Sequence, residues 1–180
     1  KDTTLALLWA AQDRDWTLFY IEPDGLFLDA KHPSASARPL TVHRNADHWF
    51  DLGDKTALRL TELDVVLMRK DPPFDMEYIY ATYLLERAEQ EGTLVVNRCQ
   101  SLRDCNEKLF ATEFPHCCPP LLVSRDMGRL RAFHSQHCDV IFKPLDGMGG
   151  SAIFRAQPGD PNVSVIWRRS PNPAVKRSWR

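Results

Sequence analysis

The stretch that decides the fold is Asp64-Val65-Val66-Leu67-Met68, a short and continuous apolar run. Such a run is typical of a parallel strand that is buried on both faces of its sheet. It stops at Arg69-Lys70-Asp71-Pro72-Pro73, where two prolines are incompatible with regular strand pairing. The pattern then predicts a helix over 76–91, ended by Gly92, and a second strand over 93–96. Strand, helix and strand in this order indicate a βαβ unit and an α/β fold with a parallel sheet.

Further elements are expected on both sides of this unit. Apolar residues at helical spacing behind a capping residue predict a helix over 2–14. Upstream of the unit we expect a strand at 17–21, a turn at 23–25, a return strand at 26–28 and an exposed loop at 31–39. Downstream we expect a helix that starts at Ser101 and has Leu109 and Phe110 on its apolar side, strands at 121–124, 140–143 and 151–155, and a helix at 126–136.

Composition restricts the class of protein. The chain has 180 residues, of which 43% are hydrophobic and 26% charged, enough for one sizeable α/β domain or one domain and part of another. Lys and Arg total 23 against 24 for Asp and Glu, which does not favour binding to nucleic acid or to an anionic membrane. No apolar run is long enough to cross a bilayer. Five cysteines, an odd number, without a secretory signal favour a reduced, cytoplasmic protein.

One group of residues invites a metal interpretation. His116-Cys117-Cys118 is followed by His134, His137 and Cys138. The spacing matches no closed zinc site, so we expect scattered surface and packing residues there and assign no metal ligand.

The stretch with the most chemical content is Val140-Ile141-Phe142-Lys143-Pro144-Leu145-Asp146-Gly147-Met148-Gly149-Gly150-Ser151. A lysine on an apolar strand precedes a glycine-rich loop, whose backbone N–H groups could donate to phosphate oxygens. The loop is neither a Walker A loop nor a Rossmann fingerprint, because it joins two strands and lacks their spacing. The alternative is a hairpin loop that needs glycines for its backbone, with Lys143 extending into solvent.

A second candidate site, the wall of a ligand-binding site, follows the strand at 64–68. Ligands of open α/β sheets lie beyond the carboxyl ends of the strands, which points to Arg69, Asp71 and Pro72. A rigid crossover turn is an equally good interpretation of this loop.

Four motifs, taken in order, resemble the bacterial-type glutathione synthetases. They are Met68-Arg69-Lys70-Asp71-Pro72-Pro73-Phe74-Asp75, Asn97, Ser101-Leu102-Arg103-Asp104-Cys105-Asn106-Glu107-Lys108-Leu109 and Lys143-Pro144-Leu145-Asp146-Gly147-Met148-Gly149-Gly150. The resemblance extends from the first residues to about Val163. It is more specific than any single glycine-rich loop.

The resemblance implies a fold and a division of the chain. Residues 1–107 would form a Rossmann-like (pre-ATP-grasp) substrate domain, and residues 108–165 the start of the small subdomain of an ATP-grasp fold. Lys108 and Lys143 would contact the phosphates of ATP. Gly147, Met148, Gly149 and Gly150 would form a loop that closes over them.

The resemblance also implies an activity. The family phosphorylates the carboxylate of γ-glutamylcysteine with ATP and Mg²⁺, and the amine of glycine attacks the acyl phosphate to give glutathione, ADP and phosphate. No catalytic residue and no Mg²⁺ ligand is identified in this chain, because the family has them further downstream. A homo-oligomer is expected for the full-length enzyme. The alternatives are an ATP-grasp ligase for another carboxylate and a non-catalytic nucleotide-binding or interaction module.

The two ends of the chain depart from the family. From the resemblance we expect the first strand of the N-terminal domain to be missing before Lys1, and therefore a chain truncated at both ends and inactive alone. Residues 166–180 are basic, lack helical or strand periodicity and resemble nothing in the family. Our hypothesis is a frame shift near Trp167: permissible codons, read from the last base of that codon, encode a capped helix, a glycine stop and an apolar strand. The alternative is a basic tail that binds an acidic partner, and the gene sequence distinguishes the two.

Overall fold

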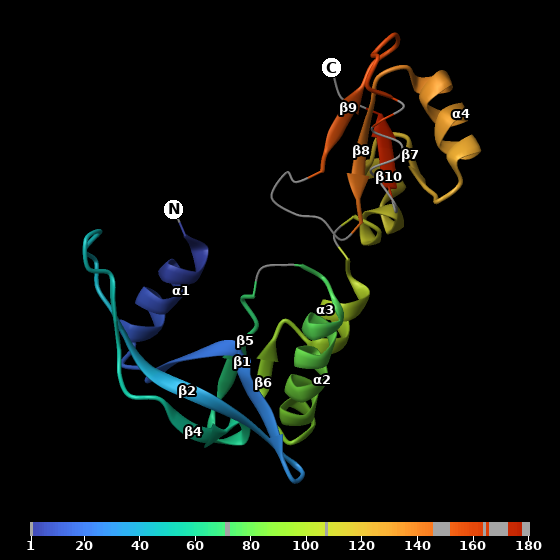
Figure 1. The fold of residues 1–180 in the computed structure, drawn as a ribbon. Coiled ribbons are helices and arrows are strands. Elements are labelled where there is room, and N and C mark those ends of the chain that lie inside the picture. The colour runs from blue at the N-terminus through green and yellow to red at the C-terminus, as the bar shows by residue number, and fades with distance from the viewer. Residues whose placement is uncertain are drawn as a thin grey trace. The chain divides into compact units, whose positions relative to one another are not determined.

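The computed structural model describes residues 2–70, 73–106, 108–145, 152–163, 165 and 173–177. The chain splits into two compact units, each of which is described by itself (Figure 1). Unit 1 comprises Lys1–Asp71 and Ile79–Leu102, and unit 2 comprises Pro72–Tyr78 and Arg103–Arg180. Among the described residues, no helix has the length and apolar character that a membrane-spanning segment requires.

Unit 1 begins with α1 (Thr3–Gln12), which confirms the predicted first helix. Asp2 caps it: its Oδ1 accepts hydrogen bonds from the backbone N–H groups of Thr4 at 2.7 Å and Leu5 at 3.1 Å. The backbone N–H of Leu5, followed by that of Thr4, lowers the pKa of the Asp2 carboxyl. The cap therefore favours the ionised carboxylate at the start of the helix.

An antiparallel sheet follows α1, with β2 paired on both of its edges (Figure 1). Its strands are β1 (Leu18–Asp29), β2 (His32–Val42), β3 (Phe50–Leu52) and β4 (Thr56–Arg59). β2 pairs with β1 on one edge and with β3 and β4 on the other.

This sheet corrects two expectations. The turn expected at 23–25 is only an irregularity of pairing between Ile21 and Leu26 in one long strand. Gly25 permits that close approach, because a Cβ there would lie 2.9 Å from the carbonyl oxygen of Ser36. The loop expected at 31–39 is part of β2, where Ala35 and Ala37 have no exposed surface. Pairing on both edges outweighs the weak strand propensity of Ser, Ala and Pro.

The predicted βαβ unit is confirmed. β5 (Val65–Leu67) and β6 (Leu94–Val96) pair in parallel, and α2 (Met76–Gln90) connects them. Gly92 ends the connection with a φ of +109°, which favours glycine. The prediction that the first strand of this unit is buried on both faces was wrong. Leu67 of β5 is 41% exposed, and the described parallel sheet has only these two strands.

The core of unit 1 lies between the antiparallel sheet and the βαβ unit. Its buried members are Ala35, Leu60, Leu85, Ala88, Val95 and Cys99. Leu60 belongs to the short 3-10 helix η1 (Leu60–Glu62), and Cys99 begins α3 (Cys99–Asp104). The helix expected from Ser101 therefore starts earlier, because buried Cys99 anchors its first turn, and it ends before Leu109 and Phe110.

Unit 2 is a second antiparallel sheet with a helix packed on it (Figure 1). Its elements are η2 (Phe110–Glu113), η3 (Pro115–Cys117), β7 (Leu121–Val123), α4 (Met127–His137), β8 (Val140–Pro144), β9 (Phe154–Ala156) and β10 (Pro173–Arg177). The strands predicted at 121–124 and 140–143 and the helix predicted at 126–136 are confirmed, whereas the strand predicted at 151–155 begins only at Phe154. Leu130 of α4 meets Val140, Phe142 and Ala156 in a fully buried cluster.

β10 corrects the description of the segment 166–180 as one without a strand. Its residues lie between β7 and β8 and pair antiparallel with both. Such pairing provides backbone hydrogen bonds that do not depend on an alternating side-chain pattern. The frame-shift hypothesis stays a prediction about the gene.

Candidate functional site

The β8–β9 hairpin carries the phosphate-site candidates. The two strands pair antiparallel from Val140 opposite Ala156 to Phe142 opposite Phe154. Residues 145–153 therefore connect two strands, as predicted. Gly147, Met148, Gly149 and Gly150 lie outside the described residues.

Lys143 leaves the core because of its place in β8. Val140 and Phe142 have no exposed surface and point into the buried cluster. Successive side chains of a strand point to opposite faces, so the half-buried Lys143 lies on the other side of the sheet from Phe142.

Lys108 reaches the same end of β8 from a distant part of the sequence. Its Nζ donates a hydrogen bond to the carbonyl oxygen of Leu145 at 3.3 Å, and the Asn106 Nδ2 donates to the same oxygen at 3.4 Å. The Asn106 Oδ1 also accepts from the backbone N–H groups of Lys108 at 3.1 Å and Leu109 at 3.2 Å. The Lys108 ammonium group thus lies where β8, the strand that carries Lys143, leads into the glycine-rich segment.

An ion pair fixes the opposite end of the hairpin. Arg155 of β9 donates from Nε to Asp139 Oδ1 at 2.9 Å and from Nη2 to Asp139 Oδ2 at 2.6 Å. The Asp139 carboxylate raises the pKa of Arg155 through these bonds. A two-point contact of this kind holds β9 beside the residue that precedes β8.

The second candidate wall belongs to unit 1. Arg69 follows β5, and its Nε donates to the Thr4 hydroxyl oxygen at 3.2 Å. Asp71 and Pro72 lie outside the described residues. Arg69 therefore supports the start of α1, and its role as a site wall stays a prediction.

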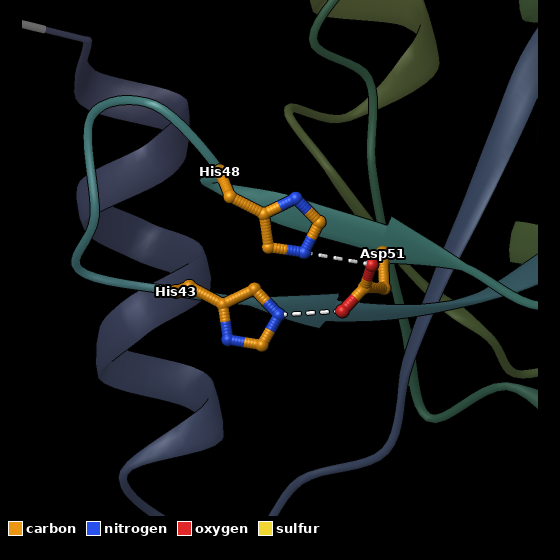
Figure 2. A group of neighbouring side chains, drawn as sticks. All are labelled: His43, His48 and Asp51. Carbon is orange, nitrogen blue, oxygen red and sulfur yellow. Dashed lines mark hydrogen bonds and ion pairs between the residues drawn. The ribbon is translucent and has the colours of Figure 1, made fainter.

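The only group of three or more metal-ligating side chains found within the described ranges is one that sequence reasoning missed. It consists of His43, His48 and Asp51, at the β2–β3 hairpin (Figure 2). Hydrogen bonds from His43 and His48 lower the pKa of the Asp51 carboxyl. The signal that could have found the group is the spacing of two histidines and an aspartate over nine positions, between one strand and the next. The candidates around His116 and His134 form no such group.

Family comparisons match both parts of the chain. Residues 1–103 match the prokaryotic glutathione synthetase N-terminal domain, and residues 107–174 match the prokaryotic glutathione synthetase ATP-grasp domain. The second match includes the first positions of β10.

Individual relatives agree with these matches. The chain is 59% identical over 166 residues to a glutathione synthetase of Pseudomonas putida and 60% identical over 166 residues to that of Pseudomonas syringae pv. tomato. The glutathione synthetase of Yersinia pestis is 56% identical over the same length. Each alignment covers 92% of this chain and 52% of the relative, so the chain spans about half the length of the curated relatives it matches.

A solved structure also resembles the chain at lower similarity. The ATP-grasp ligase PsnB, complexed with a phosphomimetic variant of its minimal precursor, Mg and ADP, is 17% identical with a TM-score of 0.48. That likeness covers 79% of this chain and 53% of PsnB. Because both family matches agree and one of them covers more than half of the sequence, this chain belongs to the prokaryotic glutathione synthetase family.

Proposed function

We propose that the chain serves glutathione synthesis: the ATP-dependent ligation of γ-glutamylcysteine to glycine, which gives glutathione, ADP and phosphate. Family membership supports this reaction. The structural observation that supports it is the hydrogen bond from Lys108 Nζ to the carbonyl of Leu145, two residues after Lys143 of β8. The resemblance assigns both lysines to one phosphate site, although 35 positions separate them in the sequence.

The two lysines would bind the phosphates of ATP. Each ammonium group has three N–H donors and a positive charge. Lys108 uses one donor to hold the Leu145 carbonyl, which keeps its charge beside the start of the glycine-rich segment. Gly147, Met148, Gly149 and Gly150 would then close over the phosphates, and their backbone N–H groups would add donors.

The reaction needs positive charge and exclusion of water. The carboxylate oxygen of γ-glutamylcysteine attacks the γ-phosphorus of ATP, and the bond from that phosphorus to the bridging oxygen of ADP breaks. The amine of glycine then displaces phosphate from the acyl phosphate and loses a proton. Mg²⁺ bound to ATP and the two lysines would neutralise the charge of the transferred group. A closed loop would protect the acyl phosphate from hydrolysis.

The other assignments belong to the same proposal. Residues 1–107 would form the substrate domain, with Arg69, Asp71 and Pro72 as a wall of its site, and residues 108–165 would begin the ATP-grasp domain. The five cysteines are free thiols, which suits a reducing compartment such as the cytoplasm.

A chimera tests the function. Residues 1–163 of this chain replace the corresponding residues of the Pseudomonas putida relative, which is 59% identical over the aligned region and supplies the segments on both sides of them. We expect the chimera to form glutathione from ATP, Mg²⁺, γ-glutamylcysteine and glycine. In the chimera, Lys143→Ala should lower kcat/KM for ATP about a hundredfold, the usual effect of losing one charge-stabilising donor.

The matched control is Lys31→Ala, which removes an exposed lysine from the turn between β1 and β2. It should leave ATP use unchanged. A folded chimera that makes no glutathione, while the complete relative does, would contradict the proposed reaction. If it ligates another carboxylate instead, the chain is an ATP-grasp enzyme of different specificity. Full activity of the folded Lys143→Ala chimera would remove the phosphate role of Lys143.

A further inference from the structure

The β2–β3 hairpin carries two imidazoles and one carboxylate that the ligase chemistry does not use (Figure 2). Asp51 Oδ2 lies 2.7 Å from His43 Nε2, and Asp51 Oδ1 lies 2.9 Å from His48 Nε2. The two rings stack with their centroids 5.2 Å apart and 21° between their planes. Both therefore direct Nε2 at the same carboxylate, and the three ligand atoms lie within 4.8 Å of one another.

Strand pairing places these side chains on one face. Thr41 of β2 lies opposite Asp51 of β3. The backbone N–H of His43 donates to the Trp49 carbonyl at 2.8 Å, so His43 continues the pairing two residues further along. Diagonal neighbours of this kind share a face of an antiparallel pair. The pairing that builds the hairpin thus also brings two of the three ligands together.

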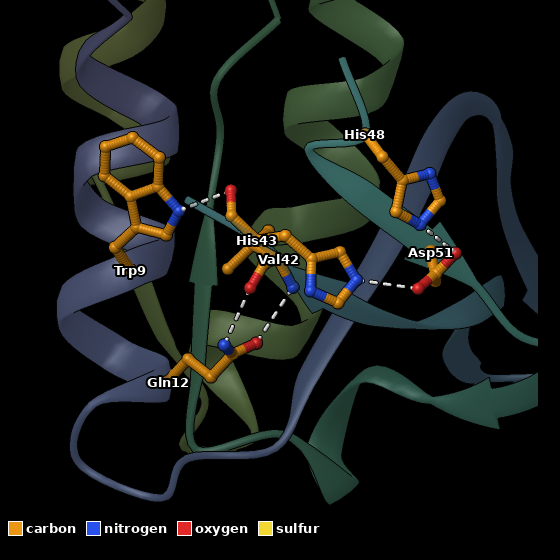
Figure 3. Close-up of polar contacts among 6 residues, drawn as sticks. All are labelled: Trp9, Gln12, Val42, His43, His48 and Asp51. Carbon is orange, nitrogen blue, oxygen red and sulfur yellow. Dashed lines mark hydrogen bonds and ion pairs between the residues drawn. The ribbon is translucent and has the colours of Figure 1, made fainter. Parts of the chain in front are cut away.

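Helix α1 holds the backbone that carries His43 (Figure 3). The Gln12 side chain donates to the Val42 carbonyl at 2.8 Å and accepts from the Val42 N–H at 2.9 Å. The Trp9 indole N–H donates to the His43 carbonyl at 3.2 Å. Val42 is only 2% exposed and these hydrogen bonds are part-buried, while the His43 side chain is 36% exposed. The position of His43 therefore does not depend on its contact with Asp51.

We propose that His43, His48 and Asp51 form a binding site for a late first-row divalent cation of the Zn²⁺ class. Imidazole nitrogen and carboxylate oxygen are ligands that such ions accept at about 2.0–2.2 Å. Each imidazole would bind through Nε2 with its proton on Nδ1. Mg²⁺ and Ca²⁺ are poor candidates, because they prefer oxygen ligands alone.

The geometry needs little adjustment to hold the ion. Tetrahedral coordination separates neighbouring ligand atoms by about 3.3 Å. The N–O separations of 2.7 and 2.9 Å involve different oxygens of Asp51, so the carboxylate would turn to offer one oxygen to the ion. The separation of that oxygen from the histidine nitrogen it now contacts would widen by about half an ångström as the cation replaces the shared proton. The side chains are 36%, 62% and 58% exposed for His43, His48 and Asp51, so an ion enters from solvent and water completes its coordination.

The site would be structural. A bound cation would link the end of β2, the loop that carries His48 and β3 through one atom. The loop would then be held by coordination bonds in place of two exposed hydrogen bonds. This role differs from that of Mg²⁺ in the ligase reaction and involves other residues.

Titration of the tag-free 180-residue chain with Co²⁺ and Zn²⁺ tests the site. The exposed thiols are first alkylated, because cysteines also bind these ions. We expect one equivalent of Co²⁺ to give a visible spectrum without thiolate charge-transfer bands, and Zn²⁺ to displace it. Zn²⁺ should also shift the side-chain NMR signals of His43 and His48.

Matched variants decide the outcome. Asp51→Asn and the double variant His43→Gln/His48→Gln should each weaken Zn²⁺ binding at least tenfold. His32→Gln, which changes an exposed histidine at the start of β2, should leave it unchanged. Circular dichroism confirms that each variant is folded. Two results would overturn the proposal. One is that the folded chain does not bind Zn²⁺ at millimolar concentration. The other is that the Asp51→Asn and His43→Gln/His48→Gln variants bind Zn²⁺ as tightly as the unchanged chain.

Discussion

Phe142 is the side chain on which the stability of unit 2 should depend most strongly. It lies in the middle of β8 with no exposed surface, packed with Leu130, Val140 and Ala156. Phe142→Ala removes a fully buried ring, whose transfer from water contributes about 2.5 kcal/mol. A residual cavity of roughly 60 Å³ adds about 1.5 kcal/mol. The free energy of unfolding of unit 2 should therefore fall by about 4 kcal/mol.

Hydrogen exchange followed by mass spectrometry measures this loss for each unit. A loss of about 4 kcal/mol corresponds to a roughly thousandfold lower protection of the slowest amides. We expect this in peptides from β7, α4 and β8. Peptides around Leu85 in α2 and Val95 in β6 are the internal reference, because they belong to the other core. Phe142→Leu is the matched control and should cost about 1–1.5 kcal/mol, since it keeps most of the apolar volume.

Two results would refute this reasoning. Protection in unit 2 that falls less than tenfold in Phe142→Ala would show that the ring is not central to the core. An equal fall in both units would show that they unfold as one body, contrary to their separate cores.

Three further predictions concern unit 1. Gln12→Ala should lower its free energy of unfolding by about 1–3 kcal/mol in urea titrations, because the backbone groups of Val42 lose two partners; an unchanged midpoint would contradict this. Asp2 has a lowered pKa, so its stabilising effect is present above the unfolded pKa and is lost as pH falls through the folded one. The Asp2→Asn variant should therefore lose less α1 helicity than the parent chain as the pH falls from about 5 to about 2, measured by circular dichroism. Identical profiles for the two proteins would count against the cap. Gly92→Ala should cost about 1 kcal/mol in urea titrations through backbone strain alone, since its φ is +109° and a Cβ would meet nothing within 4 Å; a neutral effect would contradict the strain.

Sequence reasoning succeeded where the signals are local. The apolar run at 64–68, the prolines after it and Gly92 define the βαβ unit, because each acts on the backbone within a few residues. The β8–β9 hairpin was predicted for the same reason: apolar strands flank a glycine-rich segment. The ordered motifs also sufficed to identify the family.

Sequence reasoning failed where distant partners decide the local structure. β2 contains Ser, Ala and Pro, which are weak strand formers, yet it pairs on both edges. β10 has no alternating pattern, yet it lies between β7 and β8. Hydrogen bonding to neighbouring strands supplies what propensity lacks in both cases.

The sequence by itself determined the family, the βαβ unit and Lys143 on a strand before a glycine-rich segment. Only the tertiary structure decided that Lys108 reaches the Leu145 carbonyl and that His43, His48 and Asp51 share one face of a hairpin. These contacts depend on strand register and on where a distant segment packs. Register and packing follow from hydrogen bonds and buried surface summed over the whole unit, and no short stretch of sequence contains that sum.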